Sequence, residues 1–193
     1  MALSDDARQL LLSLARNTIV REAQQLSRPD VDLSTLPDEL VNEGASFVTL
    51  TQFSQLRGCI GSLEARQPLV LDVRDNAANA AFQDPRFPPV TLREVEDLVI
   101  EISILSKPEP LPYEGPDDLI ARLRPGIDGV VIQKGWNRAT FLPQVWDKLP
   151  DPHQFVEHLC LKAHLPADAY RRQALDVSVY QVEEFSERQD AST

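Results

Sequence analysis

Cysteine, histidine and basic residues are scarce in this sequence, and the shortages exclude several classes of protein. The chain holds 2 cysteines, neither in a C-x-x-C pair, which is too few for a disulfide framework or a zinc ribbon. Its 19 Lys and Arg stand against 30 Asp and Glu, giving a net charge of -11. Because a protein that binds the phosphate backbone needs a basic surface, nucleic acid is not an expected partner.

Long apolar runs are also missing. No stretch of about 18 uninterrupted apolar residues occurs, the length that indicates a membrane span. The first residues include Asp5 and Asp6 instead of the basic region of a signal peptide, and Arg8 and Arg16 interrupt the apolar positions that follow. We therefore expect a cytoplasmic protein with reduced thiols and no membrane partner.

Familiar catalytic signatures are absent as well. The sequence contains no GxGxxG, GxxxxGK[ST], GxSxG or HExxH, which removes the recognisable nucleotide-binding, serine hydrolase and zinc protease classes. His153, His158 and His164 do not have the i, i+4 spacing of a helical metal pair. We predict no metal and no cofactor. Metal or cluster chemistry through Cys59 and a histidine is a minor alternative, because no local spacing supplies four ligands.

What the chain does contain is ordinary for a folded domain. Its 193 residues are 42% hydrophobic and 25% charged, enough for one large domain or for two lobes that share an interface. We predict a single domain over residues 1–186, with the proline-rich segment 107–116 as the candidate boundary between lobes. The polar residues 187–193 are expected to form a frayed tail.

Hydrophobic periodicity predicts both helices and strands. Helices are expected over residues 4–19, with Ser4 as the cap, and over 68–82, 116–123 and 152–163. Strands are expected over residues 47–50, 56–62, 98–105, 129–133, 139–142 and 177–182. The first two strands form a hairpin that turns at residues 51–55. The strands at 129–133 and 139–142 form a second hairpin with Trp136 near its tip.

The most informative segment is LRGCIG, residues 56–61. In an extended strand, period two places Arg57, Cys59 and Gly61 on one face and Leu56, Gly58 and Ile60 on the other. A neighbouring guanidinium favours the thiolate form of cysteine, and glycine leaves the main chain open to a ligand. The segment therefore predicts a reactive thiol at Cys59. The alternative is a small buried residue packed under a helix.

Other candidates are less specific. Glu101, on a predicted strand, points away from the main apolar layer, and Glu101 or a histidine is the candidate proton acceptor for Cys59. Arg86, between Asp84 and Phe87 in the proline-dense DPRFPPVT, is either a loop anchor or part of a site. Cys160 lies on the apolar stripe of its helix, so we interpret it as a core residue.

Four segments together, LRGCIGSLEARQPL, AAFQDPRFPPVT, EISILSKPEPL and TFLPQVWDKLPDPHQF, resemble the AMMECR domain family. Its bacterial members are called AmmeMemoRadiSam system protein A, and the resemblance runs from about residue 6 to residue 185. It implies an α+β fold of two intimately packed lobes, with antiparallel or mixed β-sheet and flanking helices. The family's shared motifs fall on Arg57, Gly58, Cys59, Ile60, Gly61, Asp84, Arg86, Phe87, Glu101, Ser103, Pro143 and Gln144.

We expect these motif residues to converge on one cleft. The candidate catalytic residues are Cys59, Arg57 and Glu101. The candidate binding residues are Gly58, Gly61, Asp84, Arg86, Ser103 and Gln144. One departure from the family lies at Ala163-His164-Leu165, where relatives usually carry Gly at the end of a helix. A left-handed cap at that point suits Gly, so His164 is expected to be strained.

The resemblance suggests partners but no reaction. The family name implies association with a radical SAM protein and with a Memo-like protein. The leading hypothesis is an enzyme-like protein in which Cys59, activated by Arg57 and by main-chain donors around Gly58 and Gly61, acts as nucleophile or acyl carrier. The alternative is a non-catalytic adaptor that presents the cleft and the Trp136 hairpin to such a partner.

Overall fold

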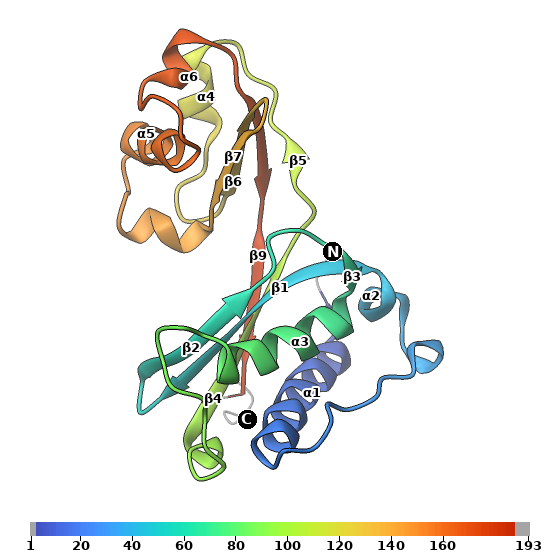
Figure 1. Ribbon diagram of the computed structural model, residues 1–193. Helices are drawn as coiled ribbons and strands as arrows, with labels where there is room; N and C mark the ends of the chain where they lie inside the picture. Colours follow the sequence, from blue (N-terminus) through green and yellow to red (C-terminus); the bar gives the residue numbers. More distant parts are fainter. Residues whose placement is uncertain (1–2, 188–193) are drawn as a thin grey trace. The chain divides into compact units, whose positions relative to one another are not determined.

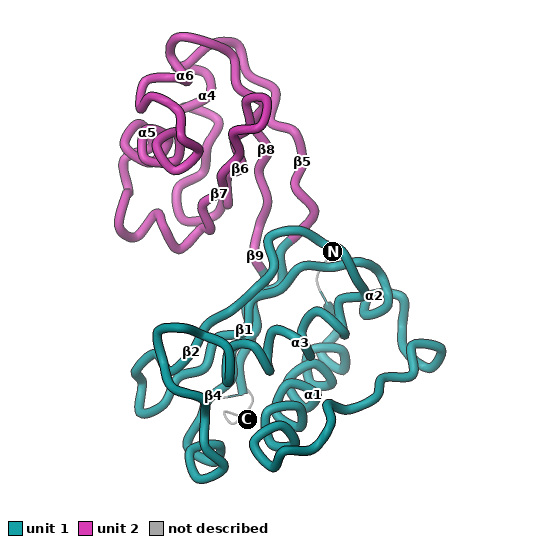
Figure 2. The backbone as a smooth tube through the Cα atoms, in the orientation of Figure 1, with its two compact units in different colours: residues 1–105, 183–193 teal, residues 106–182 magenta. Residues whose placement is uncertain are grey.

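The computed structural model describes residues 3–187 and divides the chain into two compact units (Figure 2). Unit 1 comprises residues 1–105 and 183–193, and unit 2 comprises residues 106–182. The first passage between units thus lies beside the segment 107–116. The chain then returns to unit 1 for its last strand, a crossing that the sequence pattern does not indicate. Each unit has its own antiparallel sheet and its own helices, which confirms the predicted α+β class.

Unit 1 is a sheet covered on one face by helices (Figure 1). Its strands are β1 (Glu43–Gln52), β2 (Gln55–Gly61), β3 (Gln67–Pro68), β4 (Leu98–Leu105) and β9 (Val182–Ser186). The order is β2-β1-β4-β9, and the short β3 pairs with β1. Its helices are α1 (Asp5–Ala23), α2 (Asp38–Val41) and α3 (Leu69–Phe82), with 3-10 turns at Leu33–Thr35 and Val95–Asp97. The predicted first helix, first hairpin and 98–105 strand are all confirmed.

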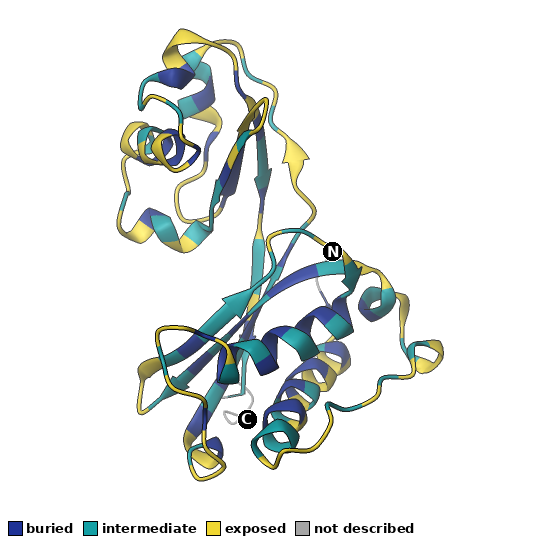
Figure 3. Cartoon of the chain, in the orientation of Figure 1, coloured by how far each residue is buried: buried dark blue, intermediate teal, exposed yellow. Residues whose placement is uncertain are grey.

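The core of unit 1 lies between the sheet and helices α1 and α3. Alternate residues of β1 and β4, such as Val48 and Ile100, are fully buried there, in keeping with period two (Figure 3). Helix α1 begins as predicted, because the Ser4 side chain accepts the Ala7 N–H. Helix α3 presents small residues, and Ala80 brings its backbone close to β2. Within the described part of unit 1, the helices α1 and α3 both pack on this one face of the sheet.

Unit 2 has the strand order β5-β8-β6-β7. Its strands are β5 (Glu109–Pro110), β6 (Gly129–Lys134), β7 (Asn137–Phe141) and β8 (Asp176–Tyr180). Its helices are α4 (Pro116–Arg122), α5 (Pro152–Lys162) and α6 (Ala169–Arg172), and a 3-10 helix covers Pro143–Asp147. In the core, Trp146 stacks on Phe155 with ring centroids 3.6 Å apart. Cys160 is fully buried, which confirms its core role, and burial raises the pKa of its thiol.

Two terminal expectations are wrong. The segment predicted as one strand over 177–182 is two strands, β8 in unit 2 and β9 in unit 1. The alternating pattern continues across exposed Gln181, so the sequence does not show that β8 pairs with β5 and β6 whereas β9 pairs with β4. Glu187 does not belong to a frayed tail: its carboxylate pairs with Arg16 and accepts the Ile100 N–H at 2.9 Å. The rest of the predicted tail, 188–193, lies outside the described residues.

The helix end at His164 forms as the resemblance implies. His164 has φ 59°, in the left-handed region that a β-carbon disfavours. The Leu165 N–H donates to the Cys160 carbonyl at 2.9 Å, so the final turn of α5 is closed. Across residues 3–187, no helix has the length and apolar character to cross a bilayer.

Candidate functional site

A β-bulge at Arg57 sets the geometry around Cys59. Gly58 pairs with Leu50, but the next pair joins Leu56 to Thr51, so Arg57 is an extra residue on β2. Leu56 therefore lies on the same face as Cys59, because residues directly opposite on paired strands share a face. The expected alternation across LRGCIG is wrong at this point, and the cause is the bulge.

The bulge aims Arg57 at a neighbouring loop. Its Nε donates to Glu94 at 3.0 Å and its Nη1 donates to the Pro88 carbonyl at 2.9 Å. The hydrogen bond from Arg57 is the main cause that lowers the pKa of Glu94 to about 2. Arg57 is thus an anchor for the loop that follows α3, and the expectation that it is the cation beside Cys59 is not met.

The two glycines around Cys59 serve packing. A β-carbon at Gly58 would lie 2.1 Å from the Ala80 carbonyl oxygen of α3, and one at Gly61 would lie 2.3 Å from the Phe47 ring. The absence of side chains lets β2 approach the helix on one face and lets Phe47 cover β2 on the other. The interpretation that these glycines leave the main chain uncovered for a ligand is therefore wrong.

The main chain of Cys59 is held by Asp84 and Arg86. Its N–H donates to Asp84 Oδ2 at 2.9 Å, and its carbonyl accepts from Arg86 Nη2 at 3.2 Å. The Asp84 side chain is only 2% exposed and pairs with Arg86 at 2.6 Å. Hydrogen bonds from Arg86 hold the pKa of Asp84 far below its usual range despite burial. Asp84 and Arg86 therefore meet Cys59 directly.

The sulfur of Cys59 also has defined neighbours. Thr49, directly opposite on β1, donates its hydroxyl to Sγ at 3.3 Å. The Cys59 sulfur is one of the groups that raise the pKa of Arg86, after the larger effect of Asp84. Cys59 itself is partly exposed, in contrast to Cys160.

Cys59 belongs to a row of side chains on the face of the unit 1 sheet turned away from α1 and α3, which we call the outer face. Thr49 of β1 pairs with Cys59 on one side and with Glu101 of β4 on the other. The outer face comprises Leu56 and Cys59 of β2, Phe47, Thr49 and Thr51 of β1, Glu101 and Ser103 of β4, and Glu184 of β9.

Two carboxylates share this face. Burial, and then repulsion from Glu184, raise the pKa of Glu101. The Ser103 hydroxyl donates to Glu184 at 3.5 Å, so the far edge of the row is polar. A carboxyl group with a raised pKa is a recurrent feature of sites that transfer protons.

The remaining candidate, Gln144, lies in unit 2 within the 3-10 helix Pro143–Asp147. Five of the candidates, Cys59, Asp84, Arg86, Glu101 and Ser103, thus gather at β2 or on the outer face of unit 1. Sequence reasoning missed Thr49, Glu94 and Glu184. Thr49 belongs to the site because the strand register places it between Cys59 and Glu101. No local pattern in the sequence indicates that register.

The histidines do not join this site within unit 1. All three lie in unit 2, where His153 Nδ1 is 3.1 Å from the Tyr170 hydroxyl. Among the described residues, no group of three or more His, Cys, Asp and Glu side chains is placed to hold a metal ion.

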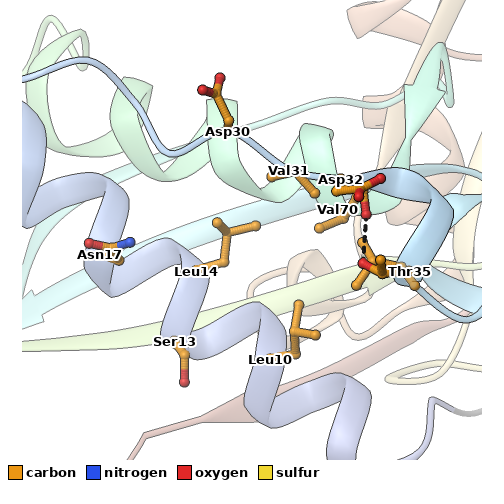
Figure 4. A pocket seen from close by; sticks show the side chains of 10 residues that line it. Leu10, Ser13, Leu14, Asn17, Asp30, Val31, Asp32, Thr35 and Val70 are labelled. Atoms are coloured by element: carbon orange, nitrogen blue, oxygen red, sulfur yellow. Dashed lines mark hydrogen bonds between the residues drawn. The ribbon is translucent and has the colours of Figure 1, made fainter.

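A second feature of unit 1 is a groove between α1 and the segment 30–36 (Figure 4). Leu10, Ser13, Leu14 and Asn17 of α1 line one side, with Asp30, Val31, Asp32, Thr35 and Leu36 opposite and Val70 of α3 beside them. The groove is open to solvent. Its polar groups stabilise their own turn: the Thr35 hydroxyl donates to the Asp32 carbonyl at 2.9 Å, and the Ser34 hydroxyl donates to the Asp32 carboxylate at 2.6 Å. None of the candidate residues lines it.

The sequence and the fold are similar to those of known proteins. A family model described as AMMECR1 matches residues 12–185. A protein of Methanothermobacter thermautotrophicus is 38% identical over 189 residues, covering 96% of each chain. Protein MJ0810 of Methanocaldococcus jannaschii is 34% identical over 169 residues, 84% of this chain and 82% of that protein. The crystal structure of the uncharacterized protein PH0010 from Pyrococcus horikoshii aligns with a TM-score of 0.80 at 32% identity, covering 96% of this chain and 93% of that one.

Proposed function

The chain belongs to the AMMECR1 family, and we propose that it is an enzyme-like protein whose Cys59 acts as nucleophile or acyl carrier for a small or peptidyl substrate. The observation that carries the proposal is the set of contacts at this residue. Cys59 is a partly exposed residue whose sulfur accepts a hydrogen bond from Thr49 and whose carbonyl accepts one from the Arg86 guanidinium. By contrast, a cysteine that serves only packing resembles Cys160, which is fully buried among apolar side chains.

The proposed reaction is acyl transfer to sulfur. The Cys59 thiol loses its proton to solvent, and the thiolate attacks the carbonyl carbon of an acyl donor. A carbon–sulfur bond forms, the bond to the leaving group breaks, and its electron pair stays with the leaving group. The Cys59 N–H does not stabilise the developing oxyanion, since Asp84 already accepts it.

Glu101 fits the role of proton donor to the leaving group. Glu101 on β4 and Cys59 on β2 are separated by Thr49 on β1, so their backbones are two strand spacings, or about 10 Å, apart. Glu101 therefore acts on the far side of a bound substrate and not directly on the sulfur. Its raised pKa keeps a proton on the carboxyl group to higher pH than in an ordinary glutamate. After donation, Glu101 regains its proton from solvent. Ser103, opposite Phe47 on the same face, is buried and donates to Glu184, so its role in the proposed site is to hold that carboxylate.

The test is the rate of iodoacetamide labelling at Cys59 as a function of pH, with labelled peptides identified by mass spectrometry. We expect Cys59 to react faster than glutathione at pH 7 and to retain that advantage at lower pH. Cys160 in the same sample is the internal control, because its buried thiol should stay unlabelled until the protein unfolds. A Cys59 that reacts more slowly than glutathione at every pH would rule out the nucleophile.

A second candidate is an adaptor, favoured by Trp136. This residue forms the tip of the two-residue turn between β6 and β7 and is fully exposed at 103%. Lys134, which pairs with Asn137 beside the turn, donates from Nζ to the Ala174 carbonyl at 3.0 Å and so holds this end of the hairpin. An exposed tryptophan on a rigid turn suits the centre of a protein interface. The partners proposed from the family resemblance are a radical SAM protein and a Memo-like protein.

Co-expression with each proposed partner separates the two functions. For an adaptor, Trp136→Ala should abolish co-purification while Cys59→Ser leaves it intact. For an enzyme, Cys59→Ser should remove turnover, whereas Trp136→Ala should leave the labelling of Cys59 unchanged. If the Trp136→Ala protein still co-purifies as the unaltered protein does, the adaptor reading of this hairpin is wrong.

A further inference from the structure

Cys59 lies on an edge strand, and its main chain faces outward. In the order β2-β1-β4-β9, β2 stands at the end and pairs with β1 alone among the strands of residues 3–187. The N–H and carbonyl of Cys59 go to Asp84 and Arg86 instead of to β1. In an antiparallel sheet such a residue would exchange both bonds with a neighbouring strand. The Asp84–Arg86 pair thus takes the place of a further strand for this one residue.

Several hydrogen bonds hold Asp84 and Arg86 in a fixed geometry. Arg86 donates three hydrogen bonds to the Asp84 carboxylate: from its backbone N at 3.1 Å, from Nε at 2.9 Å and from Nη2 at 2.6 Å. With the Cys59 N–H, the buried carboxylate accepts four donors. Pro85 between the two residues restricts the backbone further. A two-point charged contact of this kind fixes orientation as well as distance.

Further hydrogen bonds hold the loop that carries Asp84 and Arg86. The Val90 N–H donates to the Ala81 carbonyl at 2.9 Å, and Arg57 reaches Pro88 and Glu94. Arg57 therefore fixes the loop, and Arg86 is the guanidinium that meets Cys59. The two arginines have different contacts because the bulge in β2 directs Arg57 toward the loop.

We propose that Asp84 and Arg86 are positioning residues for Cys59. Their ion pair clamps the Cys59 peptide at the sheet edge through its N–H and carbonyl, which fixes the position of the Cys59 side chain and keeps the Arg86 guanidinium at the same residue. The role in reactivity rests on the proposed function of Cys59 as the reactive thiol. It assigns to Arg86 the part that the sequence pattern suggests for Arg57.

Unit 2 offers a matched control for this test. Arg124 pairs with Asp128 at 2.6 Å, and their side chains are 54% and 2% exposed, against 53% and 2% for Arg86 and Asp84. Arg124 also donates from its backbone N and from Nε to the same carboxylate. Loss of either guanidinium should therefore cost similar stability, but only Arg86 has contacts with Cys59.

The experiment compares Arg86→Gln, Arg86→Lys, Asp84→Asn and Arg124→Gln, all checked for folding by circular dichroism. We expect Arg86→Gln to slow alkylation of Cys59 at pH 7 by about 3- to 10-fold, because a partly exposed charge is lost. Arg86→Lys keeps the charge and should recover most of the rate. Arg124→Gln should leave the rate unchanged. Asp84→Asn should speed hydrogen exchange at the Cys59 amide, a readout independent of thiol chemistry.

Equal rates for Arg86→Gln and Arg124→Gln would overturn the clamp as a source of reactivity, whatever the absolute rate. The proposed function is judged separately, by the absolute rate of the unaltered protein against glutathione. A slow thiol that slows further only in Arg86→Gln would support the clamp while removing the nucleophile. Should Arg86→Gln fail to fold, Asp84→Asn decides: hydrogen exchange at the Cys59 amide as slow as in the unaltered protein would overturn the proposal.

Discussion

Thr49 Oγ1 lies 3.3 Å from Cys59 Sγ, across the two strands of the first hairpin. The outward direction of the Cys59 N–H and carbonyl marks this as a non-hydrogen-bonded pair, in which facing side chains come closest. The hydroxyl donates to the sulfur. Thr49 thus contacts the thiol from the neighbouring strand, whereas Arg86 contacts the carbonyl of the same residue from the loop beyond the edge.

Replacing Thr49 by Val removes this donor at nearly constant volume. We expect alkylation of Cys59 at pH 7 to slow by about 3- to 10-fold, the equivalent of one net hydrogen bond of about 1 kcal/mol. Thr51→Val is the matched control, because Thr51 lies on the same strand and the same face but pairs with Leu56. Equal slowing in both variants would show that the effect belongs to the strand and not to the hydrogen bond.

Replacing Gly58 by Ala forces the strand away from α3. The new β-carbon would lie 2.1 Å from the Ala80 carbonyl oxygen, and neither backbone can yield cheaply. We expect the free energy of unfolding to fall by about 2–3 kcal/mol, as measured by urea denaturation. Gly135→Ala is the comparison: its φ of 59° costs about 1 kcal/mol, but the space around it is open. A smaller loss at Gly58 than at Gly135 would contradict the close approach.

Much of the fold follows from local patterns in the sequence. The Ser4 cap, the alanine-rich face of α3 and the apolar alternation of β4 each act within one element, so the sequence alone predicts those elements. The left-handed conformation at His164 was expected for a similar reason, since the end of a helix constrains the next residue.

The arrangement at Cys59 depends on contacts between distant residues. The bulge at Arg57 exists only in the register of β2 against β1, and nothing within LRGCIG distinguishes it from a regular strand. Asp84 is 25 residues from the amide that it accepts. Arg57 and Cys59 are therefore connected through the loop that follows α3, which contacts both residues. The residues next to them in the sequence do not indicate this loop.

Acid should weaken the anchor at Glu94. Its pKa is lowered to about 2 in the folded protein from 4.5, so its contact with Arg57 stabilises the fold above about pH 4.5 and is lost as the pH falls toward 2. We expect Glu94→Gln to cost about 1–2 kcal/mol at pH 7 and progressively less in acid, since the side chain is partly exposed. Urea denaturation at several pH values measures this. A loss that stays constant down to pH 2.5 would contradict the ion pair, and the exposed Glu96→Gln should show no loss at any pH.

Glu101 should behave in the opposite way. A raised pKa means that the folded state favours the protonated carboxyl, so the stability that this preference gives is complete below the ordinary value of 4.5 and is lost as the pH rises through the raised value. At pH 7 the charge on Glu101 therefore opposes folding, and Glu101→Gln should raise the urea midpoint there.

The gain from Glu101→Gln should vanish below about pH 4.5, where unaltered Glu101 is already protonated. Glu184→Gln should give a smaller gain at pH 7, because repulsion from Glu184 is the lesser cause of the shift and burial of Glu101 remains. Glu43→Gln, at the exposed start of β1, controls for the loss of one negative charge from an acidic chain. If Glu43→Gln raised the midpoint as much as Glu101→Gln, the stabilisation would reflect net charge, and the outer face would hold no specially destabilised carboxylate to serve as a proton donor.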